Sequence, residues 1–145
     1  MQTLAELQSR MNGNDPNDAL AAANVLTNYF FVYNDEYNAL VQKKTEAELA
    51  ITAASNNPAG VDHSEILHLQ SLVLGIESRM KMQDAKMIAF QASTLAISPP
   101  TLNQVATVRQ LTTQVAALVA RDQAIENVMV ALGQVASIVN EIQGS

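Results

Sequence analysis

The stretch "ILHLQSLVLGIESRMKMQDAKMIAF", residues 66–90, carries apolar side chains at alternating steps of three and four residues. With its continuation, the series is Ile66, Leu69, Val73, Ile76, Met80, Gln83, Met87, Phe90, Thr94 and Ile97. Such a step places one apolar stripe along a helix and is typical of helices that pack nearly parallel in a bundle. We therefore predict a long amphipathic helix over residues 62–97.

The same step recurs on both sides of this stretch. Before it, the series is Ala19, Ala23, Leu26, Phe30, Tyr33, Tyr37, Leu40, Lys44, Ala47, Ile51 and Ala54. After it, the series is Val108, Leu111, Val115, Leu118, Asp122, Ile125, Met129, Leu132, Ala136 and Val139. We predict further long helices over residues 16–56 and 99–143. A short helix over residues 3–12 precedes them.

Boundary signals separate these segments. The sequence "TLAE", residues 3–6, fits a capping box, and Asp15 stands directly before a proline, as an N-cap residue often does. The sequences "NNPAG" (56–60) and "SPPT" (98–101) interrupt the long segments. Short connections make neighbouring helices antiparallel. The predicted fold is all-α: an elongated up-down-up antiparallel bundle of three long helices with a short N-terminal helix, forming a single domain over residues 1–145.

Composition limits the classes of function. Hydrophobic residues make up 48% of the chain and charged residues only 15%, with a net charge of −6 and no cysteine. Few basic residues and no basic stripe argue against nucleic-acid binding, and the missing cysteines exclude disulfides and thiolate chemistry. The start of the chain lacks the pattern of a cleavable signal peptide. We also expect no membrane span, because no window reaches about 18 uninterrupted apolar residues.

The sequence "DHSEILH", residues 62–68, contains both histidines of the chain, and Glu65 with His68 forms an E-x-x-H pair. A di-metal site in a bundle core needs a second such pair, which the chain lacks. At 100° per residue, His68 points away from the predicted core stripe. We therefore interpret Asp62 and Glu65 as a capping box at a helix start, with both histidines in solvent. We predict no metal and no cofactor.

No other constellation suggests catalysis. The chain has no G-x-S-x-G motif and no glycine-rich phosphate loop, so we predict no catalytic residues, no enzyme activity and no small-molecule substrate. In the aromatic sequence "NYFFVY" (28–33), Phe30 and Tyr33 fall on the predicted stripe, whereas Tyr29 and Phe31 do not. We therefore expect the first pair in the core and the second pair closer to solvent.

Two charges, Lys44 and Asp122, interrupt the predicted core stripes. Counting residues from the predicted turns places them at heights that agree within about 3 Å. We predict a buried or half-buried ion pair, because a matched pair tolerates burial better than a lone charge does. The alternative is that Lys44 extends to water while Asp122 lies at a groove.

The same counting predicts a surface for a partner. A straight third helix would pass the end of the second near Leu132, leaving Val135, Ile138, Val139 and Ile142 beyond the bundle. Exposed apolar patches of this kind often mark association surfaces. Three alternatives would remove the patch: a bend at Gly133, cover by the short N-terminal helix, or an interruption of the first helix.

The surface of such a bundle must draw its polarity from Asn, Gln, Ser and Thr rather than from charge. In this respect the whole chain resembles components of secretion needles, filaments and secreted helical antigens. The resemblance implies a non-catalytic interaction or structural protein, bacterial, secreted or at the cell surface by a route without a cleavable signal peptide. It also implies a protein partner or self-association. The alternative is a cytoplasmic ligand-binding or metal-dependent helical-bundle enzyme.

Overall fold

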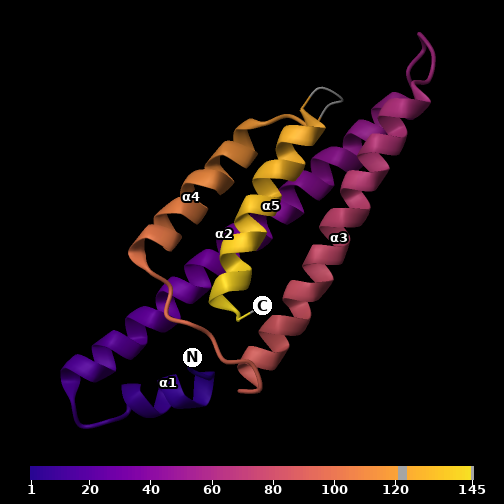
Figure 1. Cartoon of the computed structure of the whole chain (residues 1–145). Helices are drawn as coiled ribbons and strands as arrows, with labels where there is room; N and C mark the ends of the chain where they lie inside the picture. The colour runs from indigo at the N-terminus through magenta and orange to yellow at the C-terminus, as the bar shows by residue number, and fades with distance from the viewer. Residues whose placement is uncertain (121–123, 145) are drawn as a thin grey trace.

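The computed structural model describes residues 1–120 and 124–144 and is an all-helical bundle (Figure 1). Its helices are α1 (Leu4–Met11), α2 (Pro16–Ser55), α3 (His63–Gln91), α4 (Leu102–Ala117) and α5 (Ile125–Ile142). The longest helix, α2, packs against each of the others. Within the described residues, no helix is both long enough and apolar enough to span a bilayer.

The four longer helices form two antiparallel hairpins (Figure 1). Helices α2 and α3 make the first hairpin, and α4 and α5 make the second, which lies against α2. The segment over residues 92–101 crosses one end of the bundle to connect the two hairpins. At this end the amides and carbonyls of Gln2 and Ile97 pair at 2.8 Å, and the Ser98 amide donates to the Ile142 carbonyl at 2.8 Å.

The prediction of one continuous helix over residues 99–143 is wrong, because α4 ends at Ala117 and Leu118 already has an extended backbone. The reason is that a straight helix would leave its apolar C-terminal residues beyond the end of the bundle, in water. Interrupting a helix gives up about four backbone hydrogen bonds, worth roughly 1 kcal/mol each. Folding back buries Val135, Val139 and Ile142 completely or nearly so. Each such side chain gains about 1.5–3 kcal/mol, so the turn is favourable.

Residues Val135, Ile138, Val139 and Ile142 are therefore not the exposed surface that the sequence predicted. The first, third and fourth are buried with Leu7 of α1, and Ile138 packs against the same cluster. Helix α5 packs mainly against α4 and α2, so the chain folding back after α4, which is none of the three predicted alternatives, removes the patch. The chain does not bend at Gly133, which lies within α5, and α2 is not interrupted.

Helix α3 is also shorter than predicted, ending at Gln91 rather than at residue 97. The Thr94 and Leu95 amides both donate to the Ala89 carbonyl, at 2.8 and 3.1 Å, which turns the chain away from the helix axis. Ser93 takes a left-handed φ of 59° in this turn, and its hydroxyl accepts from the Ala5 amide at 3.0 Å. Ile97 remains buried, but from a non-helical segment.

The predicted helix starts are mostly confirmed. Thr3 and Glu6 form a reciprocal capping box on α1. Asp15 caps α2 with proline at the first turn, and the Asp62 carboxylate accepts from the Ser64 and Glu65 amides at the start of α3. Thr101 caps α4 in the same way as Thr3 caps α1. These side chains satisfy the amides that a helix start leaves without intrahelical partners.

The core consists of two apolar clusters. The first joins the middle and end of α2 with the first part of α3, the end of α4 and the first half of α5. The second joins the start of α2 with α1, the end of α3, α4 and the second half of α5. Along α2 the two clusters meet between Val32 and Ala39, and along α3 between Ile76 and Phe90. Buried polar side chains occupy this boundary.

At half of the predicted core positions of α2, the buried residue is the one directly before the predicted residue. Predicted positions Leu26, Tyr33, Leu40 and Ala47 do face the core or its edge. Their partners in the stripe are Ala22, Tyr29, Glu36 and Lys43, all buried, instead of Ala23, Phe30, Tyr37 and Lys44, which are only partly buried. The expectation that Tyr29 approaches solvent is wrong, since its side chain is fully buried, whereas Phe31 is 48% exposed.

Candidate functional site

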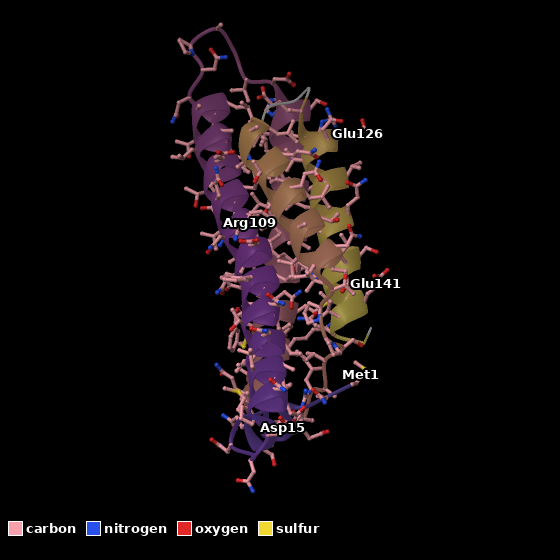
Figure 2. All side chains as sticks on the ribbon, turned by 90° about the vertical axis from the view of Figure 1, so that its left-hand side faces the viewer. Met1, Asp15, Arg109, Glu126 and Glu141 are labelled. Atoms are coloured by element: carbon pink, nitrogen blue, oxygen red, sulfur yellow. The ribbon has the colours of Figure 1, made fainter. Side chains whose placement is uncertain are left out.

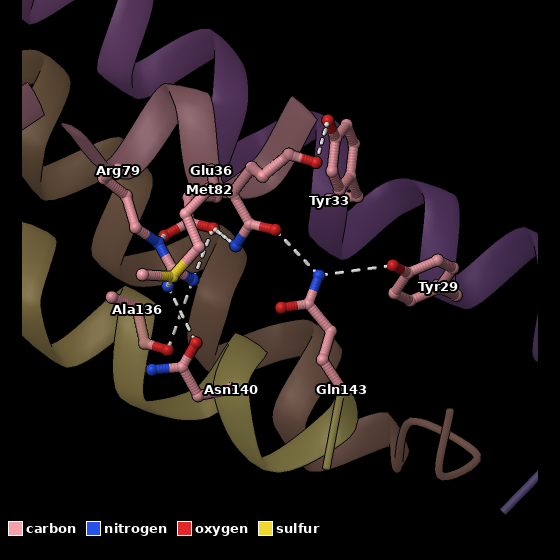
Figure 3. Close-up of polar contacts among 9 residues, drawn as sticks. Tyr29, Tyr33, Glu36, Arg79, Met82, Ala136, Asn140 and Gln143 are labelled. Carbon is pink, nitrogen blue, oxygen red and sulfur yellow. Dashed lines mark hydrogen bonds and ion pairs between the residues drawn. The ribbon is translucent and has the colours of Figure 1, made fainter. Parts of the chain in front are cut away.

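A layer of polar side chains crosses the bundle between the two apolar clusters (Figure 3). At its centre Glu36 of α2, 1% exposed, accepts two hydrogen bonds from Arg79 of α3, at 2.9 and 3.0 Å. Arg79 also donates to the Asn140 amide oxygen of α5 at 2.7 Å. A forked pair of this kind is the strongest geometry that a carboxylate and a guanidinium adopt. Three helices are thus joined through one buried anion.

The layer continues toward the end of α5 through two amides. Gln83 donates to the Glu36 carboxylate at 2.6 Å, and Gln143 donates to the Gln83 side-chain oxygen at 2.8 Å and to the Tyr29 hydroxyl at 3.2 Å (Figure 3). The carboxylate only accepts, so Gln83 must turn its NH₂ toward it, and this orientation fixes that of Gln143. As a result, the buried Gln143 Oε1 has no hydrogen-bond partner among the described residues.

Two tyrosines flank this network and stay neutral in it. Burial raises the pKa of Tyr33 to about 12, assisted by the negative charge of Asp84, and burial likewise raises the pKa of Tyr29. The Tyr33 hydroxyl donates to the Gln83 carbonyl at 3.1 Å. The two charged groups at the centre of the layer, Glu36 and Arg79, bind each other. Together with the amides, they fix the relative positions of α2, α3 and α5.

An apolar groove opens beside this layer, between α3 and α5 with Leu40 of α2 beneath it. Its volume is about 210 Å³. Gly75 and Gly133 stand on its two walls, and a Cβ added to either would meet no atom within 4 Å. The groove is open because both walls lack a side chain at these positions. Arg79 also lines the groove while it remains bound to Glu36.

A third feature is the side of α2 that faces away from the core, which we call the outward face. It consists of Leu20, Asn24, Thr27, Phe31, Asn34, Asn38, Val41 and Thr45, all exposed. No member is charged, although the face extends over about 40 Å of helix at 1.5 Å per residue. Asp35 at its edge is paired with Arg109 of α4 at 2.8 Å. In Figure 2, α2 lies along one side of the bundle and α5 along the other.

The predicted ion pair between Lys44 and Asp122 is not testable, because Asp122 lies outside the described residues. Lys44 is one-third exposed and contacts Glu77 at 3.6 Å and Glu48 at 3.7 Å. Its neighbour Lys43 is the buried cation: the ammonium binds Glu46 at 2.7 Å and donates to the Leu118 carbonyl at the end of α4. A cation at a helix C-terminus is favoured by the helix dipole.

Both histidines of the chain, His63 and His68, are exposed. Asp62 acts as the N-cap that was predicted, while the Glu65 amide is one of the donors to it. In the part of the chain that the structure describes, no three potential metal-binding side chains come together.

Sequence reasoning missed Glu36, Arg79 and Gln143, because none of them falls on a predicted core stripe. One signal was available. Glu36 and Lys43 continue the seven-residue spacing of Ala22 and Tyr29, and the opposite side of the helix is uncharged. When one face of a helix carries no charge and the other carries two charges, the sequence pattern alone does not show which face is buried.

Scans of the chain against family models, curated proteins and solved structures find no match.

Proposed function

We propose that this chain is a non-catalytic helical-bundle interaction or structural protein, bacterial, and exported or part of a secretion or envelope assembly. The observation that supports it best is the outward face of α2. Solvated helix faces normally carry charge, and charged residues are depleted at the centres of protein interfaces. An uncharged face with Leu20 62% and Phe31 48% exposed is therefore better suited to contact with protein than to water.

The polar layer supports the same proposal from inside the molecule. Its carboxylate and guanidinium bind each other at 2.9 and 3.0 Å, so they serve helix register rather than a substrate. Buried polar pairs are known to specify one arrangement of helices among several. A bundle with a fixed register presents its outer faces at fixed positions, which a structural role requires.

Export and catalysis are tested by separate measurements. An antibody against the chain, applied to unlysed cultures of its native host, should find the protein in the supernatant or on the cell surface, while a cytoplasmic marker enzyme stays in the cells. Confinement to the lysate would contradict the exported assignment. Metal analysis of purified protein should find no stoichiometric iron, manganese or zinc. Bound metal in a fixed ratio would contradict the non-catalytic assignment.

The apolar groove favours a second candidate, a ligand-binding bundle. A space of about 210 Å³ between apolar walls accepts an aromatic ring system. Anilinonaphthalene sulfonate is a suitable probe. Under this candidate it binds the native protein saturably, and Gly133→Leu, which fills the groove, abolishes binding. Glu141→Leu, which adds an equal side chain at an exposed position, should leave binding unchanged. Non-saturable or equal binding by all three proteins would reject this candidate.

A further inference from the structure

We infer that the outward face of α2 binds the outward face of a second copy of this chain, with the two helices antiparallel and a two-fold axis near residue 36. This inference rests on the proposed function, since it names the partner of a face that we assign to protein contact. It is carried by the pattern of the face itself. A two-fold contact needs a surface complementary to itself, in which residue i meets j′ and j meets i′.

The outward face has this property. Its members step by four and three residues, as in the seam of a coiled coil. Antiparallel pairing about residue 36 brings together positions whose numbers sum to about 72, a consequence of the two-fold geometry. Thr27 then meets Thr45′, Phe31 meets Val41′, and Asn34 meets Asn38′. Hydroxyl faces hydroxyl, apolar faces apolar and amide faces amide in the same register.

The positions of the charged side chains are compatible with this pairing. The three central pairs contain no charged group, so the centre of the contact requires no charge to be desolvated. The charged group nearest the axis, Asp35, is already neutralised by Arg109 at 2.8 Å. Farther out, Asn24 meets the Glu48′ carboxylate, which an amide N–H can satisfy. The outward side of α3 is a poorer candidate, because Lys81 lies between its exposed Leu74 and Ile88.

The expected contact is modest in size. Residues 20–52 span about 50 Å, and a helix is about 10 Å wide, so each copy contributes on the order of 500 Å². The total of about 1,000 Å² is near the lower limit for a specific interface. The dimer should therefore be reversible and depend on concentration, with a Kd in the micromolar range or weaker.

Charge substitutions on one pair test the geometry. Sedimentation velocity on the full chain from about 1 µM to about 1 mM should show a monomer–dimer equilibrium. Phe31→Lys and Val41→Glu should each shift it to monomer, by at least tenfold in Kd. The double variant should recover the dimer, because each Lys then meets a Glu of the other copy. Leu74→Lys on α3 is the control and should not change the equilibrium.

Both substituted side chains are 40–50% exposed, roughly, so the variants should unfold at nearly the native temperature. Cysteine pairs define the register independently, since the native chain has no cysteine. Mixed Asn34→Cys and Asn38→Cys proteins should form a mixed disulfide dimer under mild oxidation. Mixed Leu20→Cys and Asn38→Cys proteins should not, because the two positions lie about 20 Å apart along the helices in this register.

A chain that stays monomeric throughout this range, or a double variant no more associated than the single ones, would overturn the inference. Equal crosslinking of both cysteine mixtures would also overturn it. The proposed function is judged separately, by localisation and metal content. A monomeric protein found outside the cell would leave the proposed function standing and remove only the second copy as its partner.

Discussion

The two faces of α2 reverse the usual distribution of charge. The core face buries Glu36 and Lys43, at 1% and 0% exposure, whereas the outward face is exposed and carries no charge. Burying a charge is unfavourable and exposing it to water is favourable, so this distribution destabilises the fold unless the buried charges bind partners. Inside, the charges bind specific partners on α3 and α4. Outside, the missing charges leave a surface that another protein can cover.

The polarity of a helix face therefore does not by itself identify the core. Both buried charges are fully engaged: Glu36 accepts from Arg79 and Gln83, and Lys43 donates to Glu46 and to the Leu118 carbonyl. Each therefore locks α2 to a different neighbour at a different height. The apolar clusters supply most of the stability, while these contacts select which rotation of α2 is adopted.

The largest expected effect comes from breaking the polar layer. Glu36→Ala leaves Arg79 buried beside an empty space, and removing one partner of a buried pair costs about 3–5 kcal/mol. Asn38→Ala, two residues along on the outward face, should change the free energy of unfolding by less than about 0.5 kcal/mol. Urea denaturation of both variants measures the contrast. Equal effects would mean that the two faces of α2 do not differ as described.

A smaller effect is expected at the second buried charge. Lys43→Met keeps the length of the side chain but removes the donor to the Leu118 carbonyl, and an unsatisfied buried acceptor costs about 1–3 kcal/mol. Lys44→Met is the matched control, since Lys44 is one-third exposed and its ion pairs are long. It should cost less than about 0.5 kcal/mol. A larger loss of unfolding free energy for Lys44→Met than for Lys43→Met would indicate that Lys44, as the sequence pattern predicts, lies on the core stripe.

The smallest effect concerns pH. Burial raises the pKa of Tyr33 from 10.0 to about 12, so the folded state keeps its proton where the unfolded chain releases it. This contribution is complete below pH 10 and is lost as the pH rises from 10 to about 12. We expect a loss on the order of 1 kcal/mol after allowing for solvent screening.

Tyr33→Phe separates this effect from general alkaline unfolding. The variant loses the hydrogen bond to the Gln83 carbonyl at neutral pH, about 1 kcal/mol, but its stability should fall less steeply above pH 10. The pKa of Tyr29 is also raised by burial, so the stability of the variant should still fall somewhat with rising pH above 10. Denaturant titrations at several pH values on both proteins give the comparison. Identical slopes would show that Tyr33 ionises as freely in the fold as in the unfolded chain.

The helical class, the caps of α1, α2 and α3 and part of the core stripe of α3 follow from the sequence alone. Caps such as Thr3 and Asp15 act within four residues, and heptad periodicity is a property of one helix, so both are visible without tertiary contacts. Of the predicted stripe, Leu69, Ile76, Gln83 and Phe90 are buried. Leu72 is buried in place of the predicted Val73, because the pattern does not choose between apolar neighbours.

The break after Ala117 and the rotation of α2 depend on contacts between helices that are distant in the sequence. No proline or glycine marks the break, which follows from the burial of Val135, Val139 and Ile142 against distant helices. In α2, Tyr29 and Phe30 compete as apolar neighbours, and the choice falls to Tyr29 because Glu36 and Lys43 find partners on other helices. Such energies depend on atoms far apart in the chain, so no local pattern records them.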